Sequence, residues 1–169
     1  LGDINGDEIT DIGIGTLTAA ADDANDGSLF VNILNFPQDQ TSGKLKDVYR
    51  IDDQNGGLSE FVADTGYFGS SGIDQFVDLD EDGITEILVG SRWHQRLFIL
   101  DINSTGSVES FQRIQLGDLD GELSGTFTSD VAYLGDIDSD GDYEIAVTAN
   151  GYDSSTGALN IISLAKSYE

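Results

Sequence analysis

A nine-residue acidic phrase occurs three times in this chain, at Asp3–Asp11, Asp78–Glu86 and Asp136–Glu144. Each copy has Asp or Asn at its first, third and fifth positions and a carboxylate at its ninth. In a tight turn this spacing directs several side-chain oxygens toward one point, as a site for a hard cation requires. Ca²⁺ accepts about six to eight oxygen ligands in flexible geometry, whereas Mg²⁺ requires a stricter octahedron and softer metals prefer nitrogen or sulfur. The sequence therefore predicts three calcium sites.

Each loop is expected to supply side-chain ligands from positions 1, 3 and 5, a main-chain carbonyl from position 7 and the carboxylate of position 9. The expected metal ligands are Asp3, Asn5, Asp7, Ile9 and Asp11; Asp78, Asp80, Asp82, Ile84 and Glu86; and Asp136, Asp138, Asp140, Asp142 and Glu144. Glu8 stands at the sixth position, where the other loops have Gly83 and Gly141. A non-glycine residue in a left-handed turn costs on the order of 1 kcal/mol, so we expect the first loop to be the weakest.

Two rival interpretations of these turns are less consistent with the sequence. EF-hand and dockerin loops share the Asp-rich start, but their terminal ligand lies at position 12 and a helix follows, whereas here the carboxylate is at position 9 and the next residues alternate as in a strand. Three further acidic turns, Asp22–Gly27, Asp52–Glu60 and Asp118–Glu122, lack one or more ligand positions. We interpret these three as solvated turns without metal.

Composition excludes several classes of function. The chain has 169 residues, 32 acids against 7 bases and a formal net charge of -25. Such a surface repels nucleic acids and anionic membranes. Because the chain has no cysteine and one histidine, thiol catalysis, disulfides and cysteine- or histidine-clustered metal sites are excluded as well. No apolar stretch is long enough to span a membrane and no signal peptide is visible; the start at Leu1 and the lack of Met lead us to expect a segment of a longer, processed protein.

Short β-branched, alternating segments recur around each acidic loop and predict strands. The expected strands are 9–15, 84–90 and 143–149 directly after the loops; 28–34, 97–102 and 158–164 after a connector; 45–51 and 108–116 after a further turn; and 73–77 and 130–134 before the second and third loops. Asn55–Gly57 and Ser70–Gly72 are expected to form turns between strands.

Four short antiparallel strands repeated along a chain match the blade of a β-propeller. We therefore predict an all-β fold of four-stranded propeller blades, in three repeats at approximately 1–57, 58–122 and 123–169 within a single segment. The first repeat lacks its first strand and the last lacks its fourth, which gives about two and a half blades of a partial or open propeller. Open strand edges invite partners, including a second copy of the chain.

The loops and their flanking strands resemble the FG-GAP repeats of the integrin α-subunit propeller and its bacterial relatives. The loops match closely, while the flanking signature is reduced to Phe68-Gly69 and no Gly-Ala-Pro follows Gly15, Gly90 or Ala149. In that family the calcium loop joins the first two strands of a blade, and ligands bind on the opposite face. By this resemblance Arg92, Trp93, His94 and Tyr152, with the Thr16–Gly27 connector, would share a ligand face, and Tyr67 and Phe68 could join it.

The sequence thus favours a calcium-stabilised binding or adhesion module, extracellular or on the cell surface, with a protein or glycan ligand and no enzymatic activity. Weak calcium sites of about 10⁻⁴–10⁻³ M are typical of extracellular modules, which supports that location. One alternative is the propeller of a polysaccharide lyase, although seven bases make a poor cleft for an acidic glycan. Another is a structural spacer in a surface protein.

Overall fold

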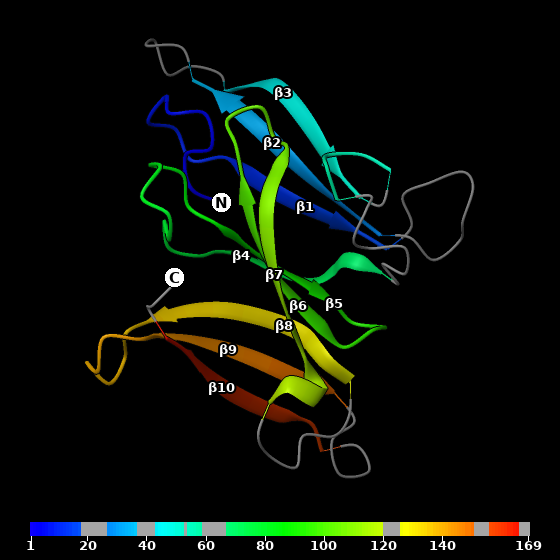
Figure 1. Cartoon of the computed structure of the whole chain (residues 1–169). Helices are drawn as coiled ribbons and strands as arrows, with labels where there is room; N and C mark the ends of the chain where they lie inside the picture. Colours follow the sequence, from blue (N-terminus) through cyan, green and yellow to red (C-terminus); the bar gives the residue numbers. More distant parts are fainter. Residues whose placement is uncertain are drawn as a thin grey trace.

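The structure is a computed structural model of the whole chain, and it describes residues 1–17, 27–36, 43–52, 54–58, 67–119, 126–150 and 156–165. These residues form ten β-strands in three antiparallel sheets and one short 3-10 helix (Figure 1). The prediction of an all-β, antiparallel fold is confirmed. No helix in the described part of the chain has both the length and the apolar character needed to cross a membrane.

The sheets follow one another along the chain, and in each of them strands that are neighbours in sequence pair with each other. The first sheet contains β1 (Ile12–Thr16), β2 (Ser28–Asn35) and β3 (Lys44–Ile51); the middle sheet contains β4 (Phe68–Gln75), β5 (Ile87–Ser91), β6 (Arg96–Ile102) and β7 (Val108–Gln115), after which comes η1 (Leu116–Asp118); the third contains β8 (Thr126–Gly135), β9 (Tyr143–Asn150) and β10 (Ala158–Leu164). Over the described residues, the first sheet thus lacks a counterpart of β4 and β8, and the third lacks a counterpart of β3 and β7.

Two predicted strand boundaries are wrong for a local reason. β1 and β5 begin at Ile12 and Ile87, three residues later than expected. The N–H groups of Ile9 and Ile84 instead donate to the side chains of Asp7 and Asp82 within the acidic loops. The start of each predicted strand therefore belongs to the loop.

The predicted turn at Ser70–Gly72 is also wrong, because these residues lie inside β4. The register of β4 against β5 shifts between Phe68 and Ser71 and again between Ser71 and Ile73, as in β-bulges. A Cβ atom at Gly72 would lie 2.4 Å from the main-chain N of Val131, so glycine here lets β4 approach β8. The glycine-rich sequence thus marks close sheet packing rather than a chain reversal.

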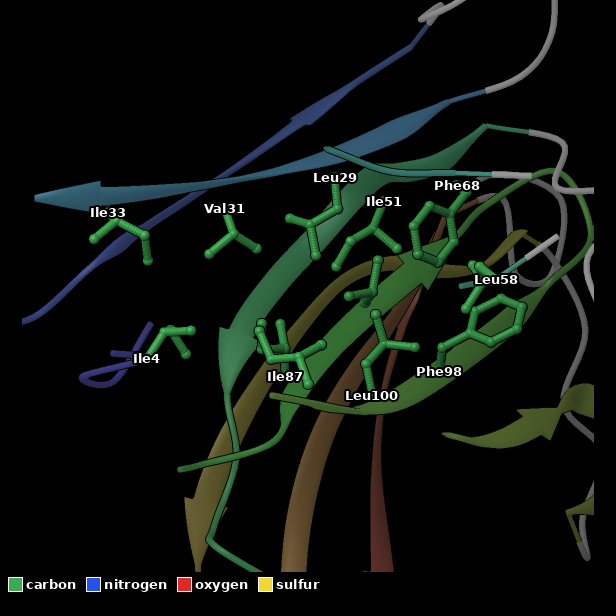
Figure 2. Packing of buried hydrophobic residues seen from close by; sticks show 12 residues of the cluster. Ile4, Leu29, Val31, Ile33, Ile51, Leu58, Phe68, Ile87, Phe98 and Leu100 are labelled. Atoms are coloured by element: carbon green, nitrogen blue, oxygen red, sulfur yellow. The ribbon is translucent and has the colours of Figure 1, made fainter. Parts of the chain in front are cut away.

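The middle sheet is buried on both faces, and all five residues of β5 are buried. One face, the front face, carries Ile87 and Val89 and packs on the first sheet; the opposite back face carries Leu97 and Ile99 and packs on the third sheet. Successive side chains of β5 and β6 therefore belong to the two apolar clusters in turn, because side chains in a strand alternate between its two faces. Figure 2 shows the first cluster, in which Leu29, Val31 and Ile33 of β2 point toward Ile87 and Leu100.

Each flanking sheet uses only one face in these clusters. The front face of the first sheet leaves Ile12 and Ile14 about half exposed, and the back face of the third sheet leaves Leu159 and Ile161 exposed in the same way. The middle sheet is therefore the element on which both neighbours depend for their burial.

Truncation of Ile87 tests this arrangement. Ile87→Ala should lower the free energy of unfolding by about 2–5 kcal/mol, because it opens a cavity in a fully buried cluster. Ile12→Ala is the matched control, since Ile12 follows loop 1 as Ile87 follows loop 2 but is 47% exposed. Urea unfolding in the presence of calcium measures both; equal losses in the two variants would contradict the two-sided burial of the middle sheet.

Candidate metal centre

Three acidic loops lie at the same end of the three sheets (Figure 1). Loop 1 (Asp3–Asp11) precedes β1, loop 2 (Asp78–Glu86) joins β4 to β5, and loop 3 (Asp136–Glu144) joins β8 to β9. Each loop passes directly into the strand that follows it, so the sheet fixes the position of its last carboxylate.

The first aspartate of each loop accepts hydrogen bonds from main-chain N–H groups further along the loop. In loop 2 the Gly83 N–H donates to Asp78 Oδ2 (2.9 Å), and in loop 3 the Gly141 N–H donates to Asp136 Oδ2 (3.0 Å). In loop 1 the corresponding donor is the Glu8 N–H, which lies 2.6 Å from Asp3 Oδ2. The same bond, spanning five residues, closes all three loops.

The aspartates at positions 3 and 5 are held by the same kind of bond over a shorter span. Asp80 Oδ1 accepts from the Asp82 N–H and Asp138 Oδ1 from the Asp140 N–H, at 3.1 and 3.2 Å. At position 5 the acceptors are Asp7, Asp82 and Asp140, each of which uses Oδ1 to bond the N–H two residues on. One oxygen of each carboxylate is thus anchored to the backbone while the other is left available.

The carboxylate at position 9 is buried in all three loops, in Asp11, Glu86 and Glu144. It accepts the N–H of the second loop residue, from Ile4 to Asp11 (2.9 Å), from Leu79 to Glu86 (3.0 Å) and from Ile137 to Glu144 (2.9 Å). A buried carboxylate needs hydrogen bonds or a cation to offset its lost hydration. This bond therefore ties the beginning of each loop to the strand at its end.

Two positions in each loop have left-handed backbone, and sequence reasoning found only one of them. The sixth position was expected, and it has positive φ at Glu8, Gly83 and Gly141. The fourth position, which was missed, has positive φ at Gly6, Glu81 and Ser139. Every loop therefore pairs one glycine with one non-glycine residue at these positions. Because the backbone cost is shared in this way, Glu8 does not by itself make loop 1 the most strained loop.

Loops 2 and 3 each bring three carboxylates together. One oxygen from each of Asp78, Asp80 and Asp82 lies within 4.8 Å of the others, and Asp136, Asp138 and Glu144 form an equivalent group. These are the only groups of three or more acidic or histidine ligands in the described part of the chain. The buried oxygens Asp78 Oδ1 and Glu144 Oε1 have no hydrogen-bond partner. Because an unpaired buried acceptor is costly, both oxygens suit direct coordination of a cation.

Electrostatic repulsion in the loops is visible in the pKa values. The pKa of Glu86 is raised to about 7, chiefly by burial and in part by the nearby carboxylates of Asp80 and Asp101, against the hydrogen bond from Leu79. Loss of hydration likewise raises the pKa of Asp138, with added repulsion from Asp140 and Glu144. A bound divalent cation would remove this repulsion and favour the ionised carboxylates.

Asp101 was missed by sequence reasoning because it lies outside the loops, on β6. Ile87 pairs with Leu100 in the sheet, which places Asp101 across from Glu86. Burial raises the pKa of Asp101, and Asp80, Glu109 and Asp82 add repulsion, while the Ser110 hydroxyl donates to Asp101 Oδ2 (3.0 Å). Only the strand register, which the sequence did not specify, could have revealed this additional negative charge beside loop 2.

Loop 1 differs from the other two loops. Both oxygens of its last carboxylate are engaged, because Asp11 Oδ1 also accepts the Leu34 N–H (2.8 Å) from β2. Asp3 Oδ1 accepts from both Gly6 and Asp7. The three carboxylates at the ligand positions of loop 1 form no group comparable to those of loops 2 and 3. The third metal site therefore stays a prediction from the sequence.

Asp52, in one of the three rejected acidic turns, has a structural role. It is buried, and its carboxylate accepts hydrogen bonds from the Asn55 side chain, the Gln54 N–H and the Ser28 hydroxyl and pairs with Arg50. Burial alone would raise the pKa of Asp52, but these hydrogen bonds and the Arg50 charge lower it below its usual value. The other two turns lie largely outside the described residues.

The turn between β5 and β6 lies at the end of the middle sheet opposite loop 2. The turn comprises Arg92–Gln95, and Trp93 within it is 69% exposed and makes an edge-on contact with Tyr67 at 5.6 Å between ring centroids. Phe68, in contrast, is fully buried against Phe98, so it does not join an exposed surface with Trp93. Tyr152 and most of the Thr16–Gly27 connector lie outside the described residues.

A scan against models of known protein families finds no match to this chain. The interpretation of the acidic loops therefore rests on their own geometry: three similar hydrogen-bonded turns, two of which gather three carboxylates each. Each of these two carboxylate groups, in loops 2 and 3, could hold one hard divalent cation.

Asp80→Asn should weaken calcium binding by loop 2 about tenfold or more, because it removes one ligand charge while the amide oxygen can still accept the Asp82 N–H. Glu81→Gln is the matched control, since it removes the same charge from the adjacent exposed residue. Isothermal titration with calcium measures both affinities. Equal losses would mean that only net charge matters and that Asp80 is no ligand.

Proposed function

We propose that this chain is a calcium-stabilised β-propeller segment that acts as an extracellular binding or adhesion module. The observation that carries the proposal is the gathering of Asp78, Asp80 and Asp82, and of Asp136, Asp138 and Glu144, in two loops with the same hydrogen-bonded frame. Oxygen-only donors favour a hard cation over a transition metal, and the flexible coordination geometry of calcium favours it over magnesium.

The propeller part of the proposal is supported by the way the sheets stack. Each sheet packs one face on the next, with the acidic loops at a common end and the β5–β6 turn at the opposite end of the middle sheet. In a propeller, four-stranded sheets are arranged in this order around an axis. The middle sheet has four antiparallel strands, the number that one such blade requires.

The role of calcium in this proposal is structural. The ion would neutralise carboxylates that otherwise repel one another at the start of β5 and β9, and thereby hold these strands in register. Sites of this kind need abundant calcium, which is consistent with an extracellular or cell-surface location.

Thermal unfolding with excess EDTA, with calcium and with magnesium tests the metal part. With free calcium 100-fold above the dissociation constant, each site should add about 2.7 kcal/mol, or about 5–11 °C in melting temperature. Magnesium should give a much smaller shift. Far-ultraviolet circular dichroism is the measurement; an identical melting temperature under all three conditions would contradict calcium stabilisation.

The β5–β6 turn is the ligand-binding surface that we propose, because exposed Trp and Arg are favoured in binding hot spots and this turn contains Arg92 and Trp93. Trp93→Ala should weaken ligand binding by about 2 kcal/mol or more, roughly 30-fold. Phe36→Ala is the control, since Phe36 is a half-exposed aromatic residue that follows β2 at the loop end of the first sheet.

Arrays of glycans and extracellular-matrix proteins, followed by titration of any positive spot, provide this measurement. Blank arrays would contradict the binding role and favour a structural spacer. If the chain turns over pectate or alginate, and substitution of Arg92 or Arg96 abolishes that turnover, the result would contradict a purely binding role and favour a lyase.

A further inference from the structure

The two outer sheet faces carry apolar side chains that the fold leaves uncovered. On the front face of the first sheet Ile12 and Ile14 are 47% and 50% exposed, and on the back face of the third sheet Leu159 and Ile161 are 64% and 51% exposed. Exposed apolar residues on adjacent positions of one sheet face mark an interaction surface more strongly than scattered ones.

The exposed residues of the first sheet occupy positions that are buried in the other two sheets. Each acidic loop is followed by an apolar pair on the front face of its sheet. The pairs are Ile12 and Ile14, Ile87 and Val89, and Ile145 and Val147. The second and third pairs are fully buried against the preceding sheet. The front face of the first sheet thus has the composition of a buried face but lacks a preceding sheet among the described residues.

The same relation holds for the back face of the third sheet. Strand registers align Leu29 and Val31 of β2, Leu97 and Ile99 of β6, and Leu159 and Ile161 of β10. The first two pairs are buried against the sheet that follows along the chain. Leu159 and Ile161 therefore occupy positions that are buried by a following sheet elsewhere in the chain, but the described residues include no sheet that covers them.

Within the chain the same type of interface forms twice: the back face of one sheet packs on the front face of the next sheet. The front face of the first sheet and the back face of the third sheet are the two surfaces of this type that stay exposed. We propose that the back face of the third sheet docks on the front face of the first sheet of a second copy of this chain. The contact is heterologous, because it joins different surfaces of the two copies. Repetition of such a contact closes a ring or, if the rotation does not close, extends a filament.

Charge favours a second copy in this head-to-tail orientation. The first sheet carries three of the chain's seven bases on β3, namely Lys44, Lys46 and Arg50, beside a single acid, Asp47. Arg50 pairs with Asp52 and lies over the ring of Phe30 on the front face. The third sheet exposes Asp130, which pairs with Thr148 next to Leu159. Head-to-tail contact brings basic β3 toward an acidic sheet, whereas contact between two third sheets would bring acids together.

This inference goes beyond the proposed function and stands on the sheet faces alone. It requires neither metal affinity nor a ligand for the β5–β6 turn. Failure of the calcium or adhesion experiments would therefore leave it standing, and its own failure would leave them unaffected.

Sedimentation and light scattering over a concentration series, in millimolar calcium, test the proposal with three variants of the 169-residue chain. Ile14→Asp disables the front face and Ile161→Asp disables the back face. Ser104→Asp, which adds the same charge on the exposed turn between β6 and β7, is the control. The unmodified chain and Ser104→Asp should associate to at least twice the mass of one chain, while each face variant alone should stay monomeric.

Mixing the two face variants is the decisive arm. Ile14→Asp retains an intact back face and Ile161→Asp an intact front face, so an equimolar mixture should form dimers and stop there. A monomeric unmodified chain, association of either variant alone, or failure of the mixture to dimerise would overturn the proposal. Circular dichroism checks that each variant is folded, and Leu159→Asp replaces Ile161→Asp if that variant is not.

Discussion

The two-sided burial of the middle sheet is the constraint on which the rest of the structure depends. Its front face is the partner of the first sheet and its back face the partner of the third, so neither outer sheet would have a core without it. The residues of β5 do not alternate between apolar and polar, because the whole strand is buried. The alternation of Ile87 and Leu88 between clusters fixes the register that positions loop 2.

Burial of the sheets also accounts for the chemistry of the loops. The last carboxylate of each loop is carried to the end of a buried strand, where it loses hydration and accepts a main-chain hydrogen bond. The other aspartates are held by the turn around it. Glu86 shows the consequence, since burial and neighbouring acids raise its pKa to about 7. A bound cation would relieve that repulsion, and metal binding would then be coupled to the packing of the sheets.

Repetition gives the three loops a shared frame without making them identical. The bond from the sixth residue to the first and the bond from the second residue to the ninth occur in every loop. The surroundings differ, because Leu34 of β2 donates to Asp11, while Asp101 of β6 adds a negative charge beside Glu86. Neighbouring strands therefore add differences between the loops that the loop sequences alone do not show.

The sequence by itself determined the all-β class, most strands and the acidic loops, because alternation and ligand spacing are local properties of the chain. It misplaced Ser70–Gly72, since a glycine-rich segment looks the same in a turn and in a bulged strand that packs closely on β8. Only the tertiary structure decided that Asp101 faces loop 2 and that Ile12 is exposed while Ile87 is buried. Those outcomes depend on pairing and stacking between segments distant in the chain, which local sequence patterns do not encode.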